Sequence, residues 1–189
     1  MLVAEPRRAG LTVWFTGLSG AGKTTIAAAV NAELERRGLV TVVLDGERVR
    51  ERMGDDLGFT RSGRDANVRR IAYIAELLNS VGAIVLVSAM SPYRHTRTEV
   101  RQRLGNFIEV YVNAPLAVCR SRDPKGLYRR AANGDLAHLS GVDDPYEPPV
   151  DPDVECHTAS ETVAESTTRV VDAITAWLSA HRFSVSRRS

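Results

Sequence analysis

The run Gly17-Leu18-Ser19-Gly20-Ala21-Gly22-Lys23-Thr24 constrains the fold most, because it has the form G-x-x-x-x-G-K-T of a phosphate-binding loop, or P-loop. An apolar, β-branched segment precedes it at 11–16, and a segment rich in Ala, Leu and Glu follows it at 25–37. The run therefore sits between a predicted strand and a predicted helix, which is the context that this loop requires. Glycines let the backbone wrap an anion, and the amides at the start of the helix point toward it.

We therefore predict a nucleotide triphosphate site at this loop. Lys23 is expected near the β- and γ-phosphates, and the Thr24 hydroxyl is expected to hold Mg²⁺. The residues predicted to contact ATP here are Gly17, Leu18, Ser19, Gly20, Ala21, Gly22, Lys23, Thr24 and Thr25.

Strands and helices alternate along the rest of the chain. Apolar runs typical of buried strands lie at 39–44, 83–89, 107–112 and 154–158. Helical patterns lie between them at 47–53, 64–81, 97–104 and 115–122, and after the last of them at 161–181. Such alternation is typical of a parallel sheet covered on both faces. We predict an α/β fold of the P-loop kinase type, a three-layer sandwich with a parallel five-stranded sheet. One domain is expected over 11–181, with a flexible leader at 1–10 and a flexible tail at 182–189.

Composition excludes several classes of protein. The net charge of +2 in 189 residues gives no argument for binding nucleic acid or a membrane. Cys119 and Cys156 have no metal-ligand or redox spacing and fit a reducing compartment. The first ten residues lack the apolar core of a signal peptide. We expect a cytoplasmic enzyme.

The segment 123–152, called the lid segment below, holds five of the eight prolines and little periodicity. A structureless stretch of this length inside a domain is usually functional, so we predict a lid over the active site. A disordered insertion is the alternative, and the apolar residues Leu127, Tyr128, Leu136 and Leu139 argue against it.

Polar residues follow two of the predicted strands, where open α/β sheets bind ligands. Asp45 and Glu47 follow the run 39–44, and Ser91 and Pro92 follow the run 83–89. A carboxylate here can orient or deprotonate a hydroxyl, or reach Mg²⁺ through water.

Several arginines follow the first of these strand ends. They favour an anionic acceptor, and a solvated basic helix face is the alternative. Together with the lid, they favour a small-molecule kinase. The residues concerned are Arg50, Arg64, Arg69 and Arg70, with Asn67 among them.

Five blocks of sequence carry a family resemblance, over about residues 11–180. They are Gly17 to Ile26; Leu44-Asp-Gly-Glu-x-Val-Arg50; Asp56-Leu-Gly-Phe-Thr60 with Arg64-Asp-x-Asn-Val-Arg-Arg-Ile71; Ser91-Pro-Tyr-Arg94; and Asp123-Pro-Lys-Gly-Leu-Tyr128 with Gly141 to Pro149. The chain resembles adenylyl-sulfate kinase (APS kinase). The resemblance implies an enzyme that uses ATP and Mg²⁺ to phosphorylate the ribose 3′-hydroxyl of adenosine 5′-phosphosulfate (APS). The products would be 3′-phosphoadenosine 5′-phosphosulfate (PAPS) and ADP, in sulfate activation.

The resemblance also implies catalytic roles. Asp45 would orient or deprotonate the hydroxyl, and Lys125 on the lid would move in when both nucleotides are bound. Ser91 matches a serine often described as a phosphoserine intermediate. We favour direct in-line transfer, with Ser91 donating a hydrogen bond to the acceptor or capping the turn before Pro92.

Binding roles follow in the same way. Arg50, Arg64 and Asn67 would hold the phosphosulfate and ribose, and Phe59 would stack on the adenine of APS or else fill the core. Arg122 would lie against the adenine of ATP. The predicted APS-binding set is Asp45, Glu47, Arg50, Phe59, Arg64, Asn67, Ser91, Pro92, Lys125 and Leu139.

Three positions depart from the family pattern. Glu47 stands where the family usually has Asp, Gly63 where an acidic residue is frequent, and Leu139 where Phe commonly covers the acceptor's adenine. We expect weaker adenine selectivity at the Leu139 face, without loss of activity.

Two alternatives stay open from sequence: a related small-molecule or nucleotide kinase with a changed acceptor, and a non-catalytic nucleotide-binding subunit. The resemblance implies a homodimer, and APS is expected from a separate ATP sulfurylase.

Overall fold

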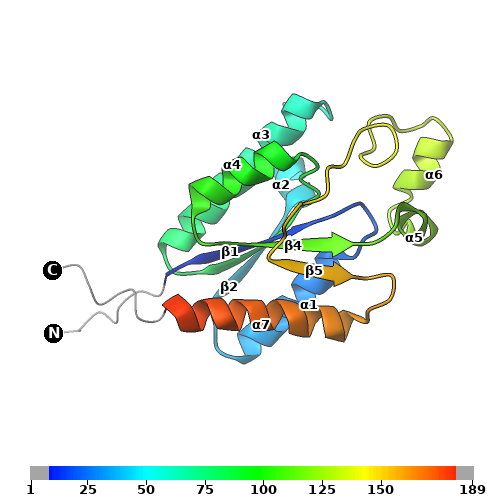
Figure 1. Ribbon diagram of the computed structural model, residues 1–189. Coiled ribbons are helices and arrows are strands. Elements are labelled where there is room, and N and C mark those ends of the chain that lie inside the picture. The colour runs from blue at the N-terminus through cyan, green and yellow to red at the C-terminus, as the bar shows by residue number, and fades with distance from the viewer. Residues whose placement is uncertain (1–8, 182–189) are drawn as a thin grey trace, which may run out of the picture.

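A parallel five-stranded sheet forms the centre of the structure (Figure 1). The computed structural model describes residues 9–181, so the expected tail and all of the expected leader except residues 9 and 10 lie outside the described range. The strand order is β2-β3-β1-β4-β5, which confirms the predicted fold class. The strands are β1 (Leu11–Thr16), β2 (Thr41–Asp45), β3 (Ile84–Ser88), β4 (Phe107–Asn113) and β5 (Val154–His157).

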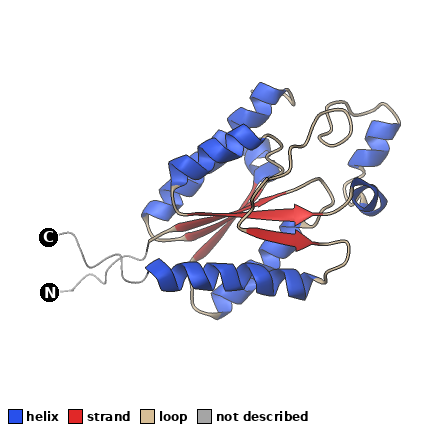
Figure 2. Cartoon of the chain, viewed as in Figure 1, coloured by secondary structure: helices blue, strands red, loops and turns tan. Residues whose placement is uncertain are grey.

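Helices cover both faces of this sheet (Figure 2). One face carries α1 (Lys23–Arg36) and α7 (Val163–His181), and the other carries α2 (Gly46–Met53), α3 (Arg61–Ser80) and α4 (Arg94–Leu104). Figure 1 shows α5 (Leu116–Arg122) and α6 (Leu127–Ala132) beyond the carboxyl end of β4. Among residues 9–181, no helix is both long and apolar enough to cross a membrane.

Alternation along β1 divides the core between these faces. Leu11, Val13 and Phe15 pack in the cluster that includes α1 and α7, whereas Trp14 packs in the cluster that includes α3 and α4. Successive side chains of a strand point to opposite faces, and both faces are covered here. This explains why β1 reads as a nearly continuous apolar run.

Several features differ from the predicted ones, and one is the start of α4, at Arg94 instead of residue 97. α3 begins at Arg61 instead of residue 64, because the Thr60 hydroxyl caps it by accepting a hydrogen bond from the Gly63 N–H at 3.3 Å. The lid segment is not structureless, since it contains α6. Gly126 precedes that helix with φ of 66°, a left-handed conformation that glycine adopts without strain.

Candidate active site

A cavity of about 1050 Å³ lies at the carboxyl ends of β2 and β3, beside the P-loop and under the lid segment. In-register pairing of Asp45 with Ser88 brings the two strand ends together. Gly17 and Leu18 are not among its lining residues. The predicted site residues that line it are Ser19, Gly20, Ala21, Gly22, Lys23, Thr24, Thr25, Asp45, Glu47, Arg50, Phe59, Arg64, Asn67, Ser91, Pro92, Arg122, Lys125 and Leu139.

The P-loop presents free backbone amides to this cavity. Gly17 has φ of 151°, and a Cβ there would lie 2.4 Å from the carbonyl oxygen of Val112, so only glycine fits. Gly22 precedes α1 with φ of 108°, and no side chain of the described residues caps the helix. The N–H groups of the first turn therefore remain available to an anion, in the field of the helix dipole.

Lys23 lies against the loop that precedes it. Its Nζ donates to the carbonyl oxygens of Gly17 at 2.9 Å and Leu18 at 2.8 Å. Burial of the ammonium group lowers the pKa of Lys23 to about 8. Phosphate oxygens would offer this cation a stronger partner than two neutral carbonyls do.

Asp45 joins the P-loop to the end of β2. Its Oδ1 accepts hydrogen bonds from the N–H groups of Glu47 at 2.9 Å and Arg48 at 3.2 Å, which caps α2. The Thr24 hydroxyl lies 3.3 Å from Asp45 Oδ2 and 3.1 Å from Ser88 Oγ. The capping bonds hold the carboxylate so that its second oxygen faces the P-loop.

The donor set at this point fits Mg²⁺. Thr24 and Asp45 supply oxygen atoms, and Mg²⁺ in nucleotide sites is held by one or two side chains together with phosphates and water. Within residues 9–181, no group of three or more His, Cys, Asp or Glu gathers as a metal site. A magnesium ion here would therefore depend on the nucleotide for the rest of its ligands.

Arg50, Arg64 and Phe59, with Asn67, form the part of the cavity that we call the acceptor half. The guanidinium carbons of Arg50 and Arg64 lie 4.9 and 5.6 Å from the centre of the Phe59 ring. Burial lowers the pKa of both arginines. Phe59 is 52% exposed, so it does not fill the core. Two partly desolvated cations beside an open aromatic ring suit a ligand with an anion and a planar base.

Asn67 supplies an acceptor atom to the same half. Its Nδ2 donates to the Gly46 carbonyl oxygen at 3.3 Å, whereas its Oδ1 is buried and receives no hydrogen bond from residues 9–181. A buried acceptor of this kind normally has a partner. A hydroxyl or amine of a bound ligand would satisfy it.

The remaining arginines of α3 do not belong to the site. Arg69 pairs with Glu99 and Arg70 with Asp56, at 2.8 and 2.7 Å, on the solvent side. The expected arginine cluster therefore divides: Arg50 lines the cavity with Arg64, and the other two match the solvated-face alternative.

The lid segment contacts the cavity near its start and near its middle. Lys125 forms an ion pair with Glu47 across the cavity mouth, and Leu139 is buried against the core cluster. The carbonyl oxygen of His138 accepts a hydrogen bond from Arg64. Arg122, just before the lid, donates to the carbonyl oxygens of Gly20, Ala21 and Thr158, so it braces the P-loop.

Ser91 is buried and carries a left-handed backbone conformation, with φ of 42°. Its Oγ accepts a hydrogen bond from Trp14 Nε1 at 3.0 Å and donates to Thr16 Oγ1 at 3.1 Å. Both capacities of the hydroxyl are thus used inside the protein.

Comparison with known proteins identifies the family. The family described as adenylylsulphate kinase matches residues 9–157. An adenylyl-sulfate kinase of Synechococcus sp. (strain JA-3-3Ab) is 59% identical over 158 residues, which cover 84% of this chain and 90% of that protein. A solved structure of an APS kinase from Mycobacterium tuberculosis, in complex with AMPPNP and APS, has a TM-score of 0.85 and 40% identity. The matched region covers 89% of this chain and 99% of the chain in that structure.

The chain belongs to the adenylylsulphate kinase family. It is therefore an enzyme of the kinase class, with the fold that the sequence predicted. The contacts that individual residues of this chain make with ligands stay predictions.

Sequence reasoning missed Arg97 and Glu109, which form a buried ion pair at 2.8 Å. A signal was present in the sequence. Glu109 interrupts an otherwise apolar strand, and a buried carboxylate needs a partner. Arg97 lies three residues before the buried Val100, on the inward face of α4.

Proposed function

We propose that this chain transfers the γ-phosphoryl group of ATP to the ribose 3′-hydroxyl of APS and releases PAPS and ADP. The observation that carries the proposal is a single cavity that joins the P-loop to the acceptor half. The high identity to adenylyl-sulfate kinases supports APS as the acceptor.

In this proposal the P-loop amides and Lys23 bind the ATP phosphates, and Thr24 with Asp45 holds Mg²⁺, which neutralises phosphate charge when bound. Asp45 also orients the acceptor hydroxyl toward the γ-phosphate. Arg50 and Arg64 hold the phosphosulfate.

Direct transfer is favoured over a phosphoserine intermediate. The Ser91 hydroxyl is buried and bonded to Trp14 and Thr16, and no general base contacts its oxygen among the described residues. Rapid-quench mixing with γ-labelled ATP, without APS, should leave Ser91 unlabelled; stoichiometric label there would contradict direct transfer.

Closure of the lid segment would bring Lys125 from Glu47 to the phosphates and exclude water. Stacking of APS on Phe59 and Leu139, the contact of Arg122 with the ATP adenine, a homodimer, a separate ATP sulfurylase and a cytoplasmic location also stay predictions.

The test is an ATP-dependent assay with purified protein, Mg²⁺ and APS, following ADP and PAPS together. We expect rapid ADP formation with APS and little with AMP or gluconate. ADP formation with another acceptor, and none with APS, would favour the kinase with a changed acceptor. Binding of ATP without turnover of any acceptor would favour the non-catalytic subunit.

A further inference from the structure

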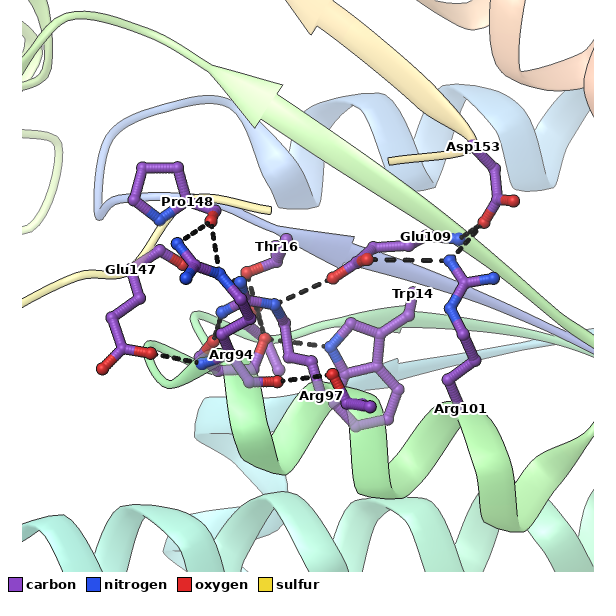
Figure 3. A network of polar contacts seen from close by, with 12 residues as sticks. Trp14, Thr16, Arg94, Arg97, Arg101, Glu109, Glu147, Pro148 and Asp153 are labelled. Carbon is purple, nitrogen blue, oxygen red and sulfur yellow. Dashed lines mark hydrogen bonds and ion pairs between the residues drawn. The ribbon is translucent and has the colours of Figure 1, made fainter. Parts of the chain in front are cut away.

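A buried polar network lies between α4, β4 and the end of the lid segment (Figure 3). At its centre the guanidinium of Arg97 is almost inaccessible to solvent and donates three hydrogen bonds. They run to Glu109 Oε1 at 2.8 Å, to the Ser91 carbonyl oxygen at 2.6 Å and to the Glu147 carbonyl oxygen at 2.6 Å. One side chain thus joins three segments that are distant in sequence.

Further bonds tie the same segments together. The Glu147 N–H donates to the Pro92 carbonyl oxygen at 2.8 Å, and the Glu147 carboxylate accepts the N–H of Arg94 at 2.8 Å, at the start of α4. The Arg94 guanidinium donates to the Pro148 carbonyl oxygen at 3.1 Å. The end of the lid segment is therefore anchored where α4 begins.

The loop 89–92, which we call the Ser91 loop, forms a wall of the cavity. Its conformation is unfavourable for a residue other than glycine, because Ser91 has positive φ, and surrounding contacts must hold it. Trp14 and Thr16 hold the hydroxyl, and Arg97 holds the carbonyl.

A second part of the cavity lining depends on the same guanidinium. Leu139 and His138 line the cavity and precede the turn 140–144, which leads directly to Glu147. The Glu147 carbonyl is the atom that Arg97 holds. A shift of Arg97 would thus move both the Ser91 loop and the lid segment, while none of its three hydrogen bonds reaches the P-loop residues 17–24.

We propose that Arg97 is a positioning residue for the acceptor: it sets the distance between the Ser91 loop and the lid segment, so that the acceptor hydroxyl meets the γ-phosphate. The proposal rests on the proposed function. Arg97 does not itself touch the reacting atoms. Its planar fork reaches three acceptors at once, which the single ammonium of lysine does not reproduce.

The test compares Arg97→Lys with Arg103→Lys, a matched change on the same helix at an exposed pair with Glu76. We expect Arg97→Lys to lower kcat/KM for APS by about 10- to 100-fold, the range for displaced reacting groups. The Kd for ATP should stay within about twofold, as for independent sites. Arg103→Lys should match the wild type in both kcat/KM for APS and the Kd for ATP.

A second readout does not depend on activity. The chain has two tryptophans, so in a Trp177→Phe background Trp14 alone reports on the Ser91 loop. Arg97→Lys should raise acrylamide quenching of Trp14 fluorescence, and Arg103→Lys should not.

Wild-type kinetics with unchanged quenching in Arg97→Lys would overturn the proposal. Equal losses for ATP and APS with a lowered unfolding temperature would also overturn it, since they indicate a general structural role. If the wild type itself fails to phosphorylate APS, the proposed function is wrong, and unchanged Trp14 quenching would separately show that Arg97 does not hold the Ser91 loop.

Discussion

At the scale of single residues, the site combines structural and chemical duties in the same side chain. Asp45 caps α2 through one oxygen and faces Thr24 through the other. The cap fixes the carboxylate orientation without a separate supporting residue. A substitution that preserves the cap but removes the charge therefore isolates the chemical role.

Asp45→Asn is that substitution, because asparagine caps a helix about as well as aspartate does. We expect kcat to fall by about 10²- to 10⁴-fold, the usual contribution of a positioned acid or base, with the unfolding temperature maintained. Steady-state kinetics and thermal unfolding measure the two effects. Asp56→Asn, at an exposed pair with Arg70, is the control; unchanged turnover in Asp45→Asn would remove Asp45 from the proposed mechanism.

The lowered pKa of Lys23 predicts that ATP binding is linked to the uptake of a proton. Burial lowers its pKa to about 8 in the free protein, and bound phosphates raise it, so ATP binding near pH 8 should take up a proton. The affinity for ATP should consequently weaken as pH rises above about 8. Calorimetry at pH 8 in two buffers with different ionisation enthalpies measures the uptake. Equal heats in both buffers at pH 8 would contradict it.

At the scale of elements, the two ends of the lid segment are held differently. The end near Glu147 is anchored by buried and backbone bonds. Near the other end, the buried Tyr128 donates to the Ser19 carbonyl oxygen at 2.8 Å, whereas Lys125 itself is held by an exposed ion pair with Glu47. Exposed pairs contribute little to stability, about 0–1 kcal/mol. We therefore expect closure to move the Lys125 side chain while the Glu147 end stays in place.

Two substitutions break that ion pair from opposite sides. Lys125→Ala should lower kcat and weaken APS binding more than ATP binding, because the lysine is lost from the transition state. Glu47→Gln frees the lysine without removing it, so its loss of kcat should be smaller. Kinetics with both substrates measure this difference. Equal losses in the two variants, or equal weakening of ATP and APS binding in Lys125→Ala, would indicate that the pair is only structural.

At the scale of the whole molecule, the cavity lies between elements that pack on different faces of one sheet. The P-loop belongs to β1 and α1, in the cluster shared with α7, whereas the acceptor half belongs to α2, α3 and the loop between them. The lid segment contacts both. In the proposed function each nucleotide alone would cover one part of the cavity, and closure of the lid would depend on both.

Thermal unfolding tests this dependence. One ligand at about 100 times its Kd stabilises a protein by about 2.7 kcal/mol. We expect a non-hydrolysable ATP analogue and APS together to stabilise by more than the sum of their separate effects. In Lys125→Ala the two effects should be additive. Additive effects in the wild type would argue against coupled closure.

Much of this architecture could be predicted from short stretches of the sequence. The P-loop, the alternation of strands and helices, and the polar residues at strand ends depend on neighbouring residues and on period, and the structure places them as expected. α6 and the early start of α3 were missed, because a short helix and a threonine cap leave little periodic signal.

Other features depended on contacts between distant residues. Trp14 and Ser91 are 77 positions apart, and Arg97 bonds to a carbonyl 50 positions away. The arginines of α3 are a similar case: charge alone does not separate Arg69 and Arg70 from Arg64, and the structure shows the first two paired on the solvent side of the helix. Local sequence records residue type and period, but the partner of a buried polar group is fixed only after the chain has folded. The sequence indicated that Glu109 needs a partner, and the tertiary structure identified that partner as Arg97.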